Sequence, residues 1–464
     1  MPHPYMANST PDARREMLDA IGVADVGALF EQIPAAHRLA RPLRLPPALA
    51  DEVSLQRHLA ELLAKNTSCE TALNFLGAGC WQHYVPAACK ELVARREWLT
   101  SVFGSPMSDH GRNQAWFEFC SQLGELIGMD LVGMPVYSWG CAAGHAIRLA
   151  ARLNGRREVL VVRAIDPERL AVIRNYCETP EMANHIDITL VDYEPATGRI
   201  DLADLARKIS EKTAAIYFEV PSYFGVVDGQ AAEIAALAHA QGAEVIVGVD
   251  PISLGVLASP ADYAADIVVG SIQPLGVPMN CGGGVGGFIA SRDEVRYARE
   301  YPTFLVSITD TVEPGERGFG LSLFHQTSYG MREKGKDWTG NSTYLWTIAG
   351  AAYMAMMGPQ GFRDIGELIL AQAHFAASQL AKVPGVRVTF PTHFFKEFVV
   401  NFDGAGKSVD AINASLRAEG IFGGKDLSRD FPELGESALY CVTEVHSRAD
   451  LERLATAVRK AVQA

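Results

Sequence analysis

Alternating apolar runs and helical patterns fill the middle of the chain. The apolar runs are short, nearly continuous and rich in β-branched residues, and they occur at 158–163, 188–192, 214–219, 244–250 and 266–270. Helical patterns separate most of them, at 140–153, 168–178, 201–210 and 230–241. Because strands buried on both faces read as unbroken apolar runs, this pattern predicts a mostly parallel sheet between layers of helices. The next run, at 285–290, is expected to return antiparallel at the sheet edge.

The two ends of the chain have different patterns. Helical stretches occur at 9–17, 21–37 and 53–64, and no obvious strand occurs before Asn74. Helical patterns at 341–357 and 362–382 flank a break at Gly358-Pro359, and strands at 386–390, 397–402 and 438–443 then mix with helices at 408–418 and 447–462. We therefore predict a helical arm (1–70), a large α/β domain (71–340), and a linking helix with a small α+β domain (341–464).

Composition narrows the class of protein. The net charge of −13 argues against nucleic acid as a partner, since phosphates need basic side chains. The eight cysteines form no CxxC pair, and no apolar run approaches a membrane span. We expect a cytoplasmic enzyme that is not embedded in a membrane. The histidines show no partner at metal-ligand spacing, so no metal site is predicted.

Candidate chemistry lies where strands end. Asp250 closes the run 244–250, and parallel sheets bind ligands at the carboxyl ends of their strands. A carboxylate here suits the protonated ring nitrogen of pyridoxal phosphate, and it equally suits the cap of the next turn. Ser138 and Gly140 open a helix whose backbone N–H groups are suited to a phosphate, although close helix packing explains the small residues as well.

Three polar segments are further candidates. His83 and Tyr84 follow a glycine-containing turn at 75–79 that either closes over a ligand or packs its aromatic rings. His110 and Arg112 stand beside Asp109 and either grip a carboxylate substrate or belong to a solvated loop. Arg332 and Lys334 belong to a charged cluster, 332–336, whose default interpretation is a solvated face. Lys334 and Lys336 are the remaining candidates for an amine near a ligand.

The chain resembles a known family over nearly its whole length. Matching segments occur in order at 15–22, 75–79 with His83-Tyr84, 125–130, 223–226, 249–255, 265–270, 394–400 and 423–444. They are similar to the N-terminal, or α, subunit of the two-subunit glycine dehydrogenase (decarboxylating), the P-protein of the glycine cleavage system. The resemblance implies a type I aminotransferase-like pyridoxal phosphate fold, with a doubly wound, mostly parallel, seven-stranded sheet, a small domain and an N-terminal arm.

The resemblance also implies that two different subunits form the active site. The cofactor loop carries a lysine in catalytic chains of this fold, but here the two positions are Gln273 and Pro274, which offer no amine for a covalent anchor. A β-type partner subunit would supply the lysine and carry pyridoxal 5′-phosphate, with none covalently bound to this chain. The complex would decarboxylate glycine and pass the aminomethyl group to the lipoyl arm of H-protein. Two sets of residues are then expected to line the shared site. Those expected to take part in catalysis are His83, Tyr84, His110, Arg112, Arg332 and Lys334, and those expected at the cofactor are Ser138, Gly140, Asp250 and Gln273.

Departures from the family pattern cluster at 101–113, 138–142 and 324–340. Loops near the expected site differ while scaffold segments such as 15–22 stay close, which suggests a paralogue whose complex acts on another small amine or amino acid. Two other hypotheses stay open. One is a structural or regulatory subunit with a vestigial pocket. The other is a stand-alone pyridoxal phosphate protein that uses an unexpected lysine or binds the cofactor noncovalently.

Overall fold

The computed structural model describes residue 3 and residues 5–39, 41–98, 106–180, 184–280, 285–322, 331–332, 335–339, 343–391 and 393–464, with residues 7 and 106–111 in their backbone alone. The chain divides into two compact units, Met1–Thr67 and Ser68–Ala464. Within the described part, no helix is long and apolar enough to cross a bilayer.

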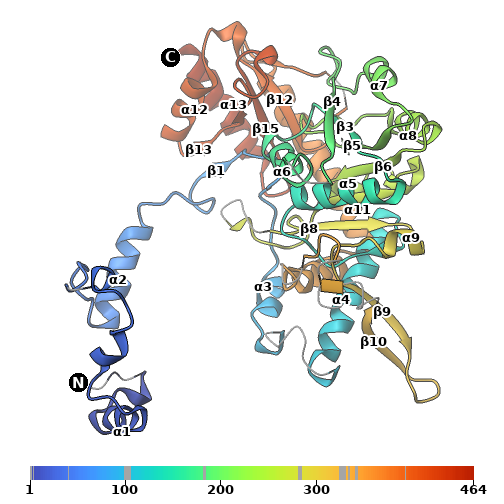
Figure 1. The fold of residues 1–464 in the computed structure, drawn as a ribbon. Helices are drawn as coiled ribbons and strands as arrows, with labels where there is room; N and C mark the ends of the chain where they lie inside the picture. The colour runs from blue at the N-terminus through green and yellow to red at the C-terminus, as the bar shows by residue number, and fades with distance from the viewer. Residues whose placement is uncertain are drawn as a thin grey trace. The chain divides into compact units, whose positions relative to one another are not determined.

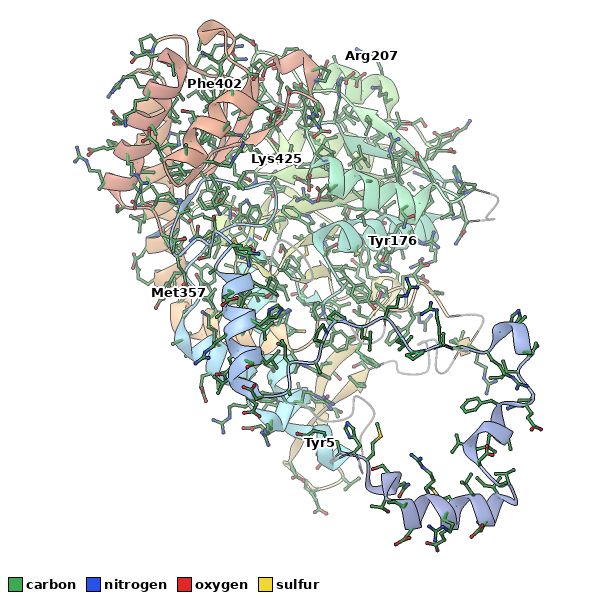
Figure 2. All side chains as sticks on the ribbon, turned by 90° about the vertical axis from the view of Figure 1, so that its left-hand side faces the viewer. Tyr5, Tyr176, Arg207, Met357, Phe402 and Lys425 are labelled. Atoms are coloured by element: carbon green, nitrogen blue, oxygen red, sulfur yellow. The ribbon has the colours of Figure 1, made fainter. Side chains whose placement is uncertain are left out.

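The first unit is a helical arm. Its elements are η1 (Ala7–Ser9), α1 (Pro11–Ile21), η2 (Val26–Phe30), η3 (Ala35–His37) and α2 (Glu52–Leu63). Asp51 caps α2 by accepting a hydrogen bond from the Ser54 backbone N–H at 2.8 Å. None of the arm's described residues is buried, and its side chains stand away from its helices instead of closing on a core (Figure 2). The predicted helical character is confirmed.

The second unit is built on a seven-stranded sheet (Figure 1). Its strands are β2 (Leu131–Val132), β3 (Glu158–Val162), β4 (Asp187–Val191), β5 (Thr213–Val220), β6 (Glu244–Val249), β7 (Ile267–Ser271) and β8 (Gly287–Ser291). They lie in the order β2-β8-β7-β6-β5-β3-β4, and only the pairs that involve β8 are antiparallel. The predicted mostly parallel sheet is confirmed, but the edge position predicted for 285–290 is wrong because β2 pairs outside β8.

Apolar side chains alternate between two cores, one on each face of this sheet. Val159, Val161 and Tyr217 pack into one core with α5 (Trp139–Asn154), α6 (Pro167–Cys177) and α9 (Val295–Ala298). The opposite core takes the alternate positions of the same strands. It also contains residues from α3 (Ala87–Val93), α4 (Pro106–Ile127), α7 (Leu202–Lys208), α8 (Ala231–Ala240), η5 (Pro251–Gly255), η6 (Pro260–Tyr263) and α11 (Trp346–Leu380). Burial on both faces explains the unbroken apolar runs.

A long helix leads into the C-terminal part. Helix α11 (Trp346–Leu380) is interrupted at Gly358, whose backbone has φ 57° and ψ 178°, as the Gly358-Pro359 pair predicted. A four-stranded antiparallel sheet follows, in the order β11 (Arg387–Val388), β12 (Glu397–Asn401), β15 (Ser437–Cys441) and β14 (Lys425–Asp426). Helices α12 (Val409–Ala418) and α13 (Arg448–Gln463), with η10 (Asp403–Ala405) and η11 (Pro432–Leu434), complete it.

Several elements are not predicted by the sequence pattern. They are the hairpin β9 (Leu305–Asp310) and β10 (Arg317–Ser322), helix α4, η4 (Arg96–Trp98), and the parallel pair β1 (Leu73–Asn74) and β13 (Ile421–Phe422). The β1–β13 pair matters for the site. It joins the segment that leads to His83 to the C-terminal part of the chain.

Candidate functional site

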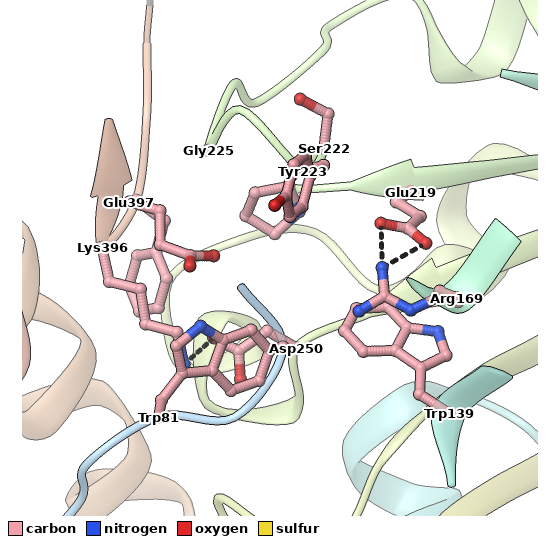
Figure 3. Close-up of a pocket in the computed structure, with 13 residues that line it drawn as sticks. Trp81, Trp139, Arg169, Glu219, Ser222, Tyr223, Gly225, Asp250, Lys396 and Glu397 are labelled. Carbon is pink, nitrogen blue, oxygen red and sulfur yellow. Dashed lines mark hydrogen bonds and ion pairs between the residues drawn. The ribbon is translucent and has the colours of Figure 1, made fainter. Parts of the chain in front are cut away.

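A small pocket opens at the carboxyl edge of the seven-stranded sheet (Figure 3). Asp250 follows β6, and residues 221–225 follow β5, so both stand where strands of a parallel sheet end. The segment 395–397, at the start of β12, forms the opposite wall. The space that the centre of a water molecule can reach here is about 20 Å³, which corresponds to about one water.

Lys396 places a buried ammonium group in this pocket. The residue is 2% exposed, and its Nζ lies 2.7 Å from Asp250 Oδ2. Nζ also lies 3.1 Å from Nε2 of His83 and 3.4 Å from the centre of the Trp81 ring. A carboxylate, an imidazole nitrogen and an indole face therefore surround the cation on three sides, which compensates the cost of burying its charge.

Asp250 has two partners. Oδ2 faces Lys396, while Oδ1 accepts a hydrogen bond from the Ile252 backbone N–H at 3.1 Å and caps η5. The side chain is 3% exposed. The capping interpretation is thus confirmed, and the second oxygen is occupied by a cation from this same chain.

His83 continues the network toward Glu444. Its Nδ1 lies 2.8 Å from Glu444 Oε2, and a lysine ammonium can only donate, so Nε2 accepts from Lys396 and Nδ1–H donates to Glu444. Burial opposes ionisation of Glu444, but hydrogen bonds from His83 Nδ1–H and the Tyr84 backbone N–H lower the pKa of Glu444 below its usual value. His83 therefore orients the ammonium of Lys396 on its side away from Asp250.

The backbone around Lys396 is fixed by close approach to the turn after β5. A Cβ on Gly225 would lie 1.8 Å from the carbonyl oxygen of Glu397, and Gly225 has φ of 81°. Only glycine fits this position. The Val442 backbone N–H donates to the Lys396 carbonyl at 2.9 Å, so Lys396 is held from both sides.

Glu397 adds a second carboxyl group to the pocket wall. Its Oε1 accepts from the Ala78 backbone N–H at 2.6 Å. Burial raises the pKa of Glu397 to about 7, although nearby Lys396 and this hydrogen bond act in the opposite direction. The pocket therefore contains a carboxyl group that changes charge near neutral pH.

Arg169 of α6 forms a second buried ion pair on the far wall. Its Nη1 lies 2.7 and 2.8 Å from the two carboxylate oxygens of Glu219, and the Tyr217 hydroxyl donates to Glu219 at 2.6 Å. The guanidinium carbon lies 3.8 Å from the centre of the Trp139 ring. Figure 3 shows this group opposite the Lys396–Asp250 pair.

Gln273 holds Trp81 in place. Its Oε1 accepts from the Trp81 backbone N–H at 3.0 Å, and its Nε2 donates to the carbonyls of Trp81 at 2.8 Å and Val277 at 3.2 Å. Gln273 is 1% exposed. Its amide is therefore committed to backbone groups, and through Trp81 it supports the ring that covers Lys396.

The start of α5 offers the remaining cofactor candidates. Ser138 caps α5 by accepting a hydrogen bond from the Cys141 backbone N–H at 3.2 Å. Gly140 packs on α6, because a Cβ there would lie 3.0 Å from Cβ of Val172. The packing interpretation accounts for both residues. Among the described residues, no group of three His, Cys, Asp or Glu side chains is placed to hold a metal ion.

Comparison with known proteins shows the family to which the chain belongs. The family model for glycine cleavage system P-protein matches residues 4–457. The chain belongs to the glycine cleavage system P-protein family. It is 34% identical to "Probable glycine dehydrogenase (decarboxylating) subunit 1" of Staphylothermus marinus, over 97% of each chain. It is 36% identical to the protein of the same name in Desulforamulus reducens, over 96% of this chain and 97% of the relative.

Solved structures agree with this family. A crystal structure of glycine decarboxylase (P-protein) of the glycine cleavage system, in inhibitor-bound form, matches with a TM-score of 0.87 and 33% identity, over 99% of this chain and 100% of that chain. A sphingosine-1-phosphate lyase of Burkholderia pseudomallei matches with a TM-score of 0.64 and 14% identity, over 93% of this chain and 94% of that one. The last likeness concerns the fold alone. The type I pyridoxal phosphate fold predicted from the P-protein resemblance is confirmed.

The structure brings together some of the residues predicted for a P-protein site and separates others. His83, Asp250 and Gln273 meet around Lys396 and Trp81. Tyr84 lies beside them in sequence but is 66% exposed, and its backbone N–H binds Glu444 at 2.7 Å.

The other predicted catalytic residues lie apart from this pocket or outside the described residues. Arg112 is buried on α4, where Nη1 donates to the Trp98 carbonyl at 3.4 Å and the guanidinium carbon lies 4.9 Å from the Trp116 ring. Arg332 is exposed, and Lys336 pairs with Glu300. The side chain of His110 and the whole of Lys334 lie outside the described residues. Their roles stay predictions.

Sequence reasoning missed the charged residues that line the pocket of this P-protein family member, namely Lys396, Glu397, Arg169 and Glu219, and it also missed Glu444, the partner of His83. One signal was available for Lys396 and Glu397. Two adjacent charges stand at the start of the apolar run 397–402, and such charges are expected to be paired if that strand is buried.

Proposed function

We propose that this chain is the first of two subunits of a glycine dehydrogenase (decarboxylating), and that a lysine of the second subunit holds pyridoxal phosphate. The observation that carries the proposal is the end-to-end likeness to relatives named as subunit 1 of that enzyme. The absence of an amine at Gln273-Pro274 supports placing the cofactor on the partner. When bound there, the cofactor accepts the electron pair that the departing carboxyl group leaves on glycine.

The proposed reaction balances with a lipoyl disulfide as acceptor. The carboxyl group of glycine leaves as CO₂, and the aminomethyl carbon bonds to one sulfur of the disulfide while the other sulfur takes a proton. The glycine carbon is thereby oxidised and the disulfide reduced. A lipoyl H-protein is the proposed carrier of that disulfide.

The arm supports a heteromeric assembly. Exposed apolar side chains recur on α2 at Leu55, Leu59 and Leu62, a spacing that places them on one face of the helix. Monomeric proteins rarely leave such a face in water, and the relatives are named as subunit 1 of an enzyme, which implies a second subunit. We assign residues 1–70 to subunit association, residues 71–340 to the cofactor-type domain, and residues 341–464 to the small domain.

The test is reconstitution from separate subunits. Glycine labelled at the carboxyl carbon is incubated with oxidised lipoyl protein, and labelled CO₂ is measured for this chain alone, for a β-type partner alone, and for the two together. We expect release only from the mixture. Full activity of the partner alone would contradict the proposal.

The diverged loops give a second candidate, namely a complex that acts on another small amine or amino acid. Within the described residues, the clearest change is Trp139, which lies in the departing segment 138–142 and lines the pocket. A mixture that leaves glycine unchanged but decarboxylates another small amino acid would favour this candidate. Ordinary turnover of glycine would exclude it.

A further inference from the structure

Pyridoxal phosphate makes four demands on a pocket of this fold. It needs an amine for its aldehyde, a carboxylate for its ring nitrogen, N–H donors for its phosphate, and space for a flat ring. Gln273 and Pro274 provide no amine. The carboxylate of Asp250 is present but already faces Lys396 at 2.7 Å.

The other two demands are met only in part. The Cys141 backbone N–H at the start of α5 is bound to Ser138 Oγ at 3.2 Å. With the side chains of Lys396 and Trp81 in place, the open space has room for about one water, whereas a substituted pyridine with a phosphate arm is many times larger. The pocket of this chain therefore does not fit the cofactor that its fold family binds.

We propose that Lys396 takes the place of the cofactor's pyridinium against Asp250, and that this internal ion pair, covered by Trp81, closes the pocket of this chain against pyridoxal phosphate. A pyridinium N–H and a lysine ammonium present the same chemistry to a carboxylate, namely a cationic N–H donor. Lys396 neutralises Asp250 as an ion pair at 2.7 Å, and it stays in place because it is part of the chain and is held by His83 and the Trp81 ring.

Lys396 is not an alternative covalent anchor. In pyridoxal phosphate the ring nitrogen and the carbon bearing the aldehyde are at opposite ends of the ring. An amine 2.7 Å from Asp250 stands at the nitrogen end, where it competes for the carboxylate and lies away from the aldehyde. The stand-alone hypothesis with an unexpected lysine therefore does not fit Lys396.

Gln273 links this closure to the loop that lacks the lysine. It binds both backbone groups of Trp81, whose ring centre lies 3.4 Å from Lys396 Nζ. Gln273, which stands in the loop where the cofactor's lysine was expected, thus supports Trp81, whose ring covers the ammonium group of Lys396. The Lys396–Asp250 pair closes the pocket whichever partner the chain takes, so its test does not depend on the proposed activity.

The test uses the full-length chain and pyridoxine 5′-phosphate. This probe has an alcohol in place of the aldehyde and cannot form imines with surface lysines. Binding is followed by equilibrium dialysis and by quenching of tryptophan fluorescence. We expect no saturable binding to the wild-type chain and, for K396A, binding of one probe per chain that is at least about tenfold tighter, since a charged hydrogen-bond partner becomes available. D250N/K396A should lose this gain.

The matched control is K336A, which removes a surface lysine paired with Glu300 and should bind like the wild type. Saturable one-to-one binding to the wild-type chain would overturn the proposal, and so would K396A that binds no more tightly than the wild type. If K396A does not fold, K396S opens the same space and replaces it.

A second measurement tests the ion pair without the probe. D250N and K396M should each lower the melting temperature by several degrees, because each leaves a buried charge without its partner. D250N/K396M should recover part of the loss, since neither charge remains. Losses that simply add would show that the two groups are not coupled and would overturn the assignment.

Discussion

Glu397 is a buried carboxyl group whose charge state changes near neutral pH. Burial raises the pKa of Glu397 to about 7 from its usual value of 4.5, against the effect of Lys396. Between these values the folded chain keeps a proton that the unfolded chain has lost. Raising the pH through this window therefore lowers the free energy of unfolding, by about 3 kcal/mol for this group alone.

E397Q should remove this dependence. The amide oxygen can still accept from the Ala78 N–H, but it carries no titrating proton. Urea unfolding of the wild type and of E397Q is compared at about pH 5 and about pH 7.5, and we expect the loss of stability over this range to be smaller in the variant by about 2 kcal/mol. E452Q, at an exposed pair with Arg448, is the control and should follow the wild type. Parallel profiles for E397Q and the wild type would contradict the expectation.

For single residues, the sequence predicts where a side chain lies on a strand or helix better than which other side chain it contacts. Asp250 is predicted at a strand end because an apolar run stops there, and this is confirmed. Its partner Lys396 lies far along the chain, and no local pattern connects them. Arg169 and Glu219 are missed for the same reason. An arginine in a helical pattern is expected at the surface, and only the fold shows that Arg169 is buried against Glu219.

Among the elements, α11 contains one break with a clear physical cause. Gly358 has φ 57° and ψ 178°, a region that side chains disfavour strongly, and a Cβ there would meet nothing within 4 Å. G358A should therefore destabilise the chain through backbone strain alone, by about 1–3 kcal/mol in urea unfolding.

A matched control stands three residues further along the same helix. At Gly361 an added Cβ would lie 3.2 Å from Met357, a flexible side chain, and the position lies after the break in α11. We expect G361A to change stability by less than about 1 kcal/mol. Equal losses in G358A and G361A would show that packing, and not the backbone conformation of Gly358, limits this site.

The elements that the sequence predicts well are those with strong local signals. Strands β3, β5, β6 and β7 are buried on both faces and read as unbroken apolar runs. Strands β1 and β13 have two residues each, and their pairing joins Leu73 to Ile421, so neither a pattern nor a nearby turn indicates them. The hairpin β9–β10 contains several exposed residues and lacks the alternation that would mark it.

For the whole molecule, the arm predicts dependence on a second subunit. Leu55, Leu59 and Leu62 of α2 are 43–47% exposed, and burying leucines at an interface stabilises association. L55S/L59S/L62S should weaken binding to the β-type subunit by more than about tenfold, measured by sedimentation or calorimetry. R57A/E61A changes polar positions of the same helix and should bind normally. Unchanged association in the leucine variant would exclude α2 as the contact.

The pairing of β1 with β13 also sets an order in time for a newly made chain. Trp81 and His83 follow β1, yet β1 needs Ile421 and Phe422, and His83 needs Glu444. Ribosomes add about 5–20 residues per second, so this wall of the pocket waits roughly 20 to 70 s for its partners to emerge. During synthesis the buried cation of Lys396 cannot yet be fully enclosed. A nonsense mutation at the start of β15 should therefore leave His83 in this wall of the pocket without Glu444, even though every residue of the seven-stranded sheet has been translated.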